Sequence, residues 1–308
     1  MQHLNKVLCG VLVLILCVPL FAQYSAGENQ DVQMYTGTKS TTSRTVLAEC
    51  FTGTWCQYCP AAEGALNRLA NEMDRSQLAI IEWHYGDAYE PPDGSSSQRK
   101  DFYGVPGFPT TFFDGLNPYI GGSTNANDAT VYNAYKTSIN NRLAEPSPIS
   151  ISLSGYLAGS YGIINAQITV LNTLNASTNG TYVHFVLCED KNKSVVSGGK
   201  TYWLRFDAEK NLGMDLLNVG VGQTLSLQKN FTIDASWDTD RLWIAVFVQN
   251  HDRTYHEGLD TYYTAEVYQS AVLNISAQPV PENSSTGLIL VSCIPAGIAV
   301  AWIRRKTH

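Results

Sequence analysis

The sequence predicts an α/β domain followed by an all-β sandwich domain, with a single transmembrane helix near the C-terminus. Apolar runs alternate with segments of helical periodicity between residues 45 and 145, which is typical of an α/β domain. Between residues 149 and 276 only short strand-like runs occur, separated by Gly, Asn, Ser and Asp. An apolar segment then precedes a basic end. With 308 residues, 44% of them hydrophobic, the chain is long enough for two cores.

The first residues predict export. Lys6 precedes an almost continuously apolar run over residues 7–21, and the small residue Ala22 follows the run. This pattern is typical of a secretory signal peptide, here covering residues 1–22. An uncleaved anchor is the alternative, because Leu20 is large for a position just before a cleavage site. Both interpretations place the chain outside the cytoplasm. A polar lead follows over residues 23–44.

Residues 45–145 form the predicted α/β domain. Short apolar runs predict strands, and apolar residues at helical spacing predict helices. The expected strands are Thr45–Phe51, Leu78–Tyr85 and Thr110–Phe113, and the expected helices are Pro60–Met73 and Asp128–Leu143. Asn127 or Asp128 should cap the second helix. Pro146 and Pro148 mark the boundary with the next domain.

Residues 149–276 form the predicted sandwich. Its strands are expected at Ile149–Tyr156, Ile163–Leu174, Tyr182–Cys188, Thr224–Ile233, Leu242–Gln249 and Ala265–Ile275. Residues 197–217 fit this pattern least well, and a long connection with some helix is expected there.

The C-terminal residues predict attachment to a membrane. A linker over residues 277–286 leads into the apolar segment 287–303 and a basic tail over residues 304–308. Positive charge after an apolar segment stays in the cytoplasm, so the C-terminus is predicted to be cytoplasmic. Alternatively, the segment is a sorting signal that is cleaved and replaced by a lipid. Both interpretations anchor the protein to the cell membrane or surface.

Charge and glycosylation signals describe the surface. Lys and Arg number 20 against 27 Asp and Glu, and no basic run precedes the tail, so nucleic acid is not an expected partner. Asn-x-Ser/Thr sequons begin at Asn175, Asn179, Asn192, Asn230, Asn274 and Asn283. Glycans there would cover the second domain and leave the first bare, which suits a macromolecular substrate.

The motif Trp55-Cys56-Gln57-Tyr58-Cys59-Pro60 lies between a predicted strand and a predicted helix. A helix N-terminus stabilises a thiolate, so Cys56 is the predicted nucleophile and Cys59 the resolving thiol. A zinc site is not expected, because no further Cys or His follows at ligand spacing. A permanent structural disulfide is the alternative.

A second signature is the run from Tyr103 to Gly115, with sequence YGVPGFPTTFFDG. Together with the Cys-x-x-Cys motif it resembles the thioredoxin superfamily over about one hundred residues. The resemblance implies that Pro109 is cis and packs against the disulfide, and that the backbone of Phe108 pairs with a substrate strand. Trp55, Gln57 and Tyr58 would support this groove. The wider frame, with Phe51–Cys56 and Glu82–Asp87, resembles the outer-membrane-protein-related (Omp-type) secreted thioredoxin-like proteins.

One position departs from the family pattern. Thioredoxins carry a buried acid six residues before the first cysteine, and this chain has Cys50 there. Glu49 should point to the opposite sheet face, whereas Glu82 on a neighbouring strand is a possible replacement. Cys50 is expected to be a buried free thiol, and a disulfide with Cys59 or with Cys188 is the alternative. The histidines His84, His184, His251 and His256 are expected to be ordinary hydrogen-bonded side chains.

These observations predict a membrane-anchored, extracytoplasmic thiol–disulfide oxidoreductase. Its expected partners are protein thiols or disulfides and a redox partner protein, with the membrane bound through the C-terminal segment. No dissociable cofactor and no metal are expected. The alternative is a non-catalytic surface binding or adhesion protein in which the Cys56–Cys59 disulfide is structural.

Overall fold

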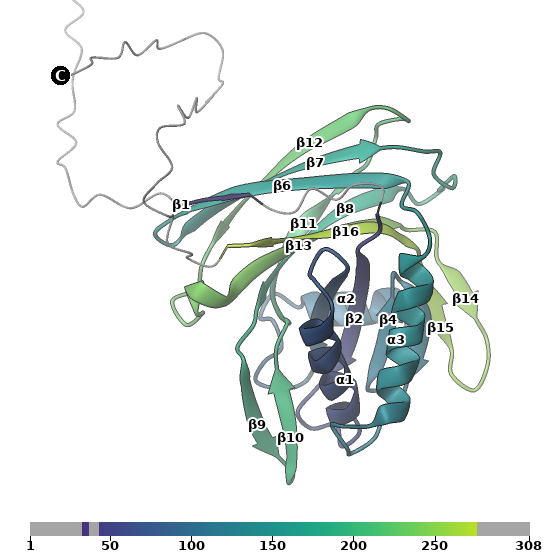
Figure 1. Ribbon diagram of the computed structural model, residues 1–308, viewed down its shortest axis with the longest axis vertical. Coiled ribbons are helices and arrows are strands. Elements are labelled where there is room, and N and C mark those ends of the chain that lie inside the picture. Colours follow the sequence, from purple (N-terminus) through teal and green to yellow (C-terminus); the bar gives the residue numbers. More distant parts are fainter. Residues whose placement is uncertain (1–32, 37–42, 276–308) are drawn as a thin grey trace, which may run out of the picture. The chain divides into compact units, whose positions relative to one another are not determined.

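The computed structural model describes residues 33–36 and 43–275. Strands dominate the described part of the chain, and two sheets contain most of them (Figure 1). The four-stranded sheet has the order β1 (Gln33–Thr36), β6 (Ile149–Ala158), β7 (Tyr161–Val170) and β12 (Thr224–Thr232). The eight-stranded sheet has the order β16 (Val267–Asn274), β13 (Leu242–Asn250), β8 (Thr181–Glu189), β11 (Asp207–Leu216), β3 (Leu78–His84), β2 (Val46–Thr52), β4 (Thr110–Phe113) and β5 (Leu116–Ile120).

Smaller elements complete the fold. Two hairpins are formed by β9 (Lys193–Ser197) with β10 (Lys200–Leu204) and by β14 (Thr254–His256) with β15 (Tyr262–Thr264). The α-helices of the described residues are α1 (Cys59–Glu72), α2 (Ser95–Tyr103) and α3 (Ala129–Leu143), and a short 3₁₀ helix covers Thr239–Arg241.

The predicted fold class is wrong. An α/β domain followed by a separate sandwich would keep the strands of the two segments in different sheets, whereas here β16, β13, β8 and β11 continue directly into β3, β2, β4 and β5 in one mixed sheet. The junction is a parallel pairing of β11 with β3, in which Asp207 lies opposite Glu82. The segment predicted as a connection over residues 197–217 contains β11, and this strand joins the two halves.

Two strands show why the halves cannot be separated physically. On β8, Phe185 faces the core beneath the four-stranded sheet, and Val186 faces the core that contains β2, β3 and the helices. On β13, Ile244 likewise faces the core beneath the four-stranded sheet, and Trp243 faces the core that contains β2, β3 and the helices. Since side chains alternate along a strand, each of these strands serves both cores at once. A strand that is buried on both faces has a nearly continuous apolar sequence. Its pattern therefore does not show that its two faces belong to different cores.

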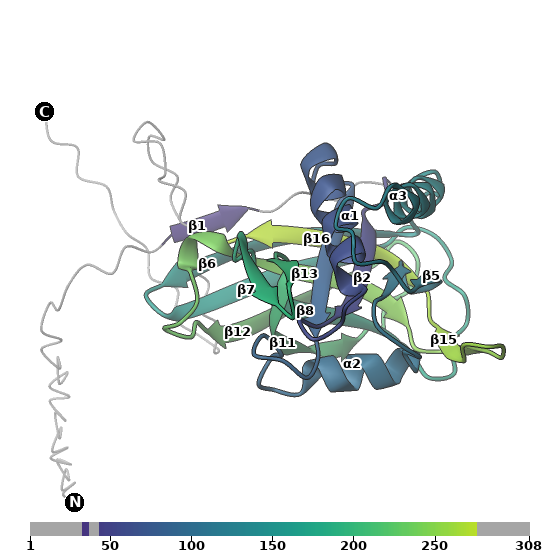
Figure 2. The ribbon, with the colours of Figure 1, turned by 90° about the horizontal axis from the view of Figure 1, so that it is seen from below.

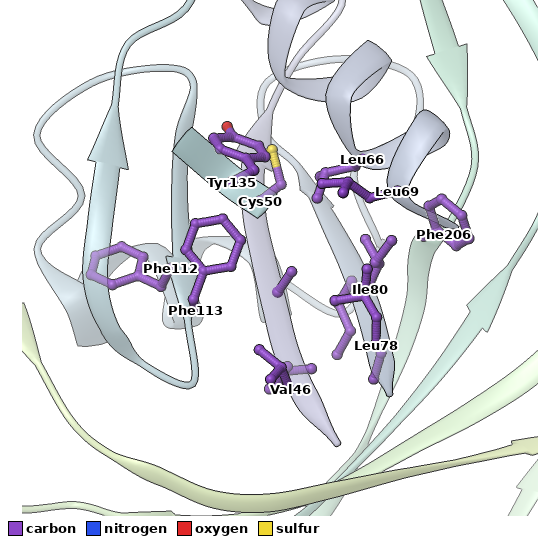
Figure 3. Packing of buried hydrophobic residues seen from close by; sticks show 14 of the residues in the cluster. Val46, Cys50, Leu66, Leu69, Leu78, Ile80, Phe112, Phe113, Tyr135 and Phe206 are labelled. Atoms are coloured by element: carbon purple, nitrogen blue, oxygen red, sulfur yellow. The ribbon is translucent and has the colours of Figure 1, made fainter. Parts of the chain in front are cut away.

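The helices cover the two faces of the β2–β3–β4 region. Helices α1 and α3 lie on one face and α2 on the other, as the two views show (Figures 1 and 2). On the α1 face, Leu66 and Leu69 pack with Ile80 and Phe113 in an apolar core (Figure 3). The predicted Asp128 cap is confirmed, because its side chain accepts hydrogen bonds from the backbone N–H groups of Thr130 and Val131.

No helix of the described residues has the length and apolarity needed to cross a membrane. The predicted C-terminal transmembrane helix lies outside the described residues. The signal peptide, the linker, the apolar segment 287–303 and the basic tail all fall outside the described residues.

Candidate functional site

Cys56 and Cys59 form a disulfide at the start of α1, with their Cα atoms 5.5 Å apart. The backbone N–H of Cys59 donates to the carbonyl oxygen of Cys56 at 3.3 Å. Tyr58, at the N-cap position, offers no side-chain hydrogen bond to the helix, and the first turn contains no acidic residue. The positive end of the helix dipole is therefore not neutralised by a capping side chain beside the two sulfur atoms.

Aromatic side chains surround the disulfide. Trp55 is 53% exposed and Tyr58 is 48% exposed, and Gln57 between the cysteines is exposed as well. The indole N–H of Trp55 donates to the carbonyl oxygen of Tyr85 at 2.7 Å, which fixes the ring. The ring of Phe108 lies 5.2 Å from that of Trp55 and packs against the cysteines. An exposed apolar rim thus adjoins the disulfide.

The Phe108–Pro109 peptide bond is cis, as the resemblance implied. Gly122 fills the space between this proline and the motif. A Cβ atom on Gly122 would lie 2.4 Å from the carbonyl oxygen of Tyr58 and 3.0 Å from Cγ of Pro109. Only glycine allows the loop after β5 to approach so closely. The structure therefore brings Phe108 and Pro109 to the cysteine motif.

The β9–β10 hairpin covers the disulfide, and the sequence did not predict it. The phenol of Tyr202 donates to the carbonyl oxygen of Cys56 at 3.0 Å, and Val195 packs beside it. Under this cover Cys56 is 4% exposed and Cys59 is fully buried. The available signal was the Gly198-Gly199 turn, where both residues have positive φ, as a tight hairpin turn requires.

Glu63 lies one helical turn after Cys59 and was not predicted as a site residue. The spacing puts both side chains on one face of α1. The carboxylate accepts hydrogen bonds from the hydroxyl of Thr52 at 2.6 Å and from the backbone N–H of Trp203 at 2.9 Å. Burial raises the pKa of Glu63 to about 7, although His84 opposes the shift. A carboxyl group that titrates near neutrality can give and take a proton.

The position that holds an acid in thioredoxins contains a buried free thiol, as expected. Cys50 forms no disulfide and lies beside Tyr135 in the core (Figure 3). Burial and the nearby Glu82 raise the pKa of the Cys50 thiol well above its usual value, so this thiol is unreactive. Glu49 lies on the opposite face of β2, where Arg99 of α2 binds it at 2.7 Å.

Glu82, His84 and Asp207 form a buried cluster beside Glu63. Their ligand-type atoms all lie within 4.8 Å of one another. Burial, followed by the charges of Glu63 and Asp207, raises the pKa of Glu82 well above its usual value. Burial disfavours the charged form of His84, but Asp207 and Asp87 outweigh it and raise its pKa well above 6.5. Among the described residues, this is the group whose oxygen and nitrogen atoms are placed to hold a metal ion.

The other histidines of the described residues have hydrogen-bond partners, as expected. Nε2 of His184 lies 2.9 Å from Nε2 of His251, and Nε2 of His256 lies 2.8 Å from the hydroxyl of Thr264.

Comparison with known proteins supports the fold alone. No family model and no curated protein sequence matches the chain. The solved structure of HBP35 of Porphyromonas gingivalis is similar, with a TM-score of 0.55, 16% identity and 82% of each chain covered.

Proposed function

We propose that the chain is an extracytoplasmic thiol–disulfide oxidoreductase that acts on protein thiols and disulfides. The observation that carries the proposal is the position of the Cys56–Cys59 disulfide at the uncapped N-terminus of α1. That position favours the thiolate form of Cys56 over the thiol after reduction. The exposed rings of Trp55 and Tyr58 offer an apolar surface to a polypeptide substrate.

The chemistry needs only the two thiols and a protein partner. In the reduced state, the Cys56 thiolate attacks one sulfur of a substrate disulfide, and the other substrate sulfur leaves as a thiolate. Cys59 then loses its proton and attacks the Cys56 sulfur of the mixed disulfide. The second substrate thiolate leaves, the Cys56–Cys59 disulfide is restored, and two electrons have passed to the substrate. A redox partner resets the enzyme, and the same steps run in reverse oxidise a dithiol.

The burial of the two sulfurs favours a second candidate. Cys59 is fully buried and the β9–β10 hairpin covers Cys56, which suits a structural disulfide in a non-catalytic surface binding protein. The two candidates differ in how readily the bond is reduced.

Equilibration of the chain from residue 23 with graded glutathione buffers measures the reduction potential of the Cys56–Cys59 bond. A value between about −120 and −270 mV belongs to exchange catalysts, and a value below about −300 mV belongs to structural disulfides. The second result would refute the oxidoreductase and favour the binding protein.

Trapping checks the roles of the two cysteines. Cys59→Ser should accumulate a mixed disulfide with a disulfide-containing peptide, whereas Cys56→Ser should form none. Cys188→Ser is the matched control, because Cys188 is a buried free thiol outside the motif, and it should exchange like the wild type. Mass spectrometry of the non-reduced products identifies the linked sulfur. A mixed disulfide in Cys56→Ser would contradict the assignment of the nucleophile.

A further inference from the structure

The Glu82–His84–Asp207 cluster lies where the two halves of the chain meet. Glu82 and His84 are two residues apart on β3, so their side chains share one face of the sheet. Asp207 begins β11 and lies opposite Glu82 in the parallel pairing. The shared face is the one that α1 covers, because Thr52, which pairs with His84, donates to Glu63 of α1.

The atoms that point into the cluster lack hydrogen-bond partners. Oε2 of Glu82, Nε2 of His84 and both carboxylate oxygens of Asp207 are buried and make no hydrogen bond within the described residues. The three residues are at most 1% exposed. A buried polar atom without a partner is costly, and so many in one place indicate a missing ligand.

His84 is oriented as a metal ligand would be. Its Nδ1 lies 2.9 Å from Oδ2 of Asp87, and Asp87 is itself fixed by the backbone N–H groups of Thr54 at 2.7 Å and Tyr89 at 2.9 Å. When Nδ1 donates to a carboxylate and a metal ion displaces the proton from Nε2, the lone pair of Nε2 faces the cluster. A carboxylate bound to the far nitrogen of a ligating histidine is the usual support of a metal site.

The charge and spacing of the cluster favour a divalent cation. In the described part of the chain no Lys or Arg forms an ion pair with Glu82 or Asp207, and the cation nearest to Asp207 is the protonated ring of His84. Nε2 of His84 lies 3.5 Å from Oδ1 of Asp207, at the outer limit for a hydrogen bond. If a zinc ion lay at its usual distance of about 2.0–2.1 Å from both of these atoms, the angle between the two bonds at the ion would be roughly tetrahedral.

We propose that Glu82, His84 and Asp207 bind one Zn²⁺ ion between β3 and β11. A fourth coordination position remains for water or for a neighbouring carboxylate. The ion links β3 to β11 at Glu82 and Asp207, where the two strands pair. It therefore stabilises the part of the sheet beneath α1, at whose start Cys56 and Cys59 lie.

Zinc titration of the oxidised chain, stripped with a chelator beforehand, tests this site. Competition with a chromophoric chelator should give one Zn²⁺ per chain. Asp207→Asn and His84→Gln should weaken binding by at least about 100-fold, and Asp87→Asn by about 10- to 100-fold. The matched control is His256→Gln, which removes a histidine from β14 and should bind like the wild type.

The outcomes separate this site from accidental binding. Absence of stoichiometric binding to the wild type, or unchanged affinity in Asp207→Asn, overturns the proposal. If Asp207→Asn fails to fold by circular dichroism, Asp87→Asn and the Co²⁺ spectrum of the wild type decide. Cobalt bound by nitrogen and oxygen gives visible bands without a thiolate-to-cobalt absorption, and a thiolate absorption would place the metal on cysteine and overturn the proposal.

Discussion

At the scale of single residues, Glu63 has the strongest claim to a chemical role besides the cysteines. It shares a helix face with Cys59, is buried, and has a pKa of about 7 because burial disfavours its charge. The resolving step requires Cys59 to lose a proton. The carboxylate form of Glu63 is a base that can take this proton. The Cys50 thiol cannot do so, because its pKa is raised well above the usual value.

We therefore predict that Glu63→Gln slows resolution of the mixed disulfide at neutral pH by on the order of 100-fold. In the wild type the rate should rise with pH through about 7, where Glu63 ionises and becomes a base. In the variant the rise should move to higher pH, toward the titration of the thiol. Stopped-flow measurement of resolution against pH checks this. Glu72→Gln, at the exposed end of the same helix, is the control. An unchanged pH profile in Glu63→Gln would remove Glu63 from the mechanism.

At the scale of elements, the β9–β10 hairpin controls access to the disulfide. Its β10 strand contacts α1, and its hydrogen bond to the motif comes from Tyr202. The two strands pair only with each other, so the hairpin can open without breaking the larger sheets. Local opening of such an element costs less than global unfolding.

Tyr202→Phe should speed reduction of the Cys56–Cys59 bond by dithiothreitol. Loss of one hydrogen bond is worth about 1 kcal/mol, which corresponds to a roughly fivefold increase in the open population. Val196→Ser, at a hairpin position that is 74% exposed, should reduce at the wild-type rate. Equal rates for Tyr202→Phe and the wild type would mean that the hairpin does not limit access.

Elements with local signals were predictable from the sequence, and those that depend on distant pairing were not. The strand over residues 46–52 and helices α1 and α3 have clear periodicity, and the disulfide motif has its own spacing. Strand β11 lacks a continuous pattern because register shifts interrupt its pairing with β8. Without β11, nothing in the sequence places Asp207 beside Glu82, and the cluster could not be predicted. Glu63 could have been found from its spacing to Cys59.

At the scale of the whole molecule, buried polar contacts join the two halves in addition to the shared strands. Gln249 of β13 accepts a hydrogen bond from Arg99 at 2.7 Å, and Arg99 also binds Glu49 of β2. Arg142 of α3 binds Asp114 at 2.9 Å and Glu266, next to β16, at 3.0 Å. Removal of the second half would take Gln249 from Arg99 and Glu266 from Arg142, while Glu49 and Asp114 would remain as their partners.

We therefore predict that a fragment of residues 43–147 does not fold alone. It would expose the edge of β3 and the apolar faces that β8 and β13 cover, because these strands belong to both cores. A chain of residues 43–275 is the control. Its urea unfolding should give one transition, coincident by far-ultraviolet circular dichroism and tryptophan fluorescence. The fragment should show no cooperative transition. A cooperative transition in the fragment would mean that residues 43–147 fold independently, with the second half added to an already stable unit.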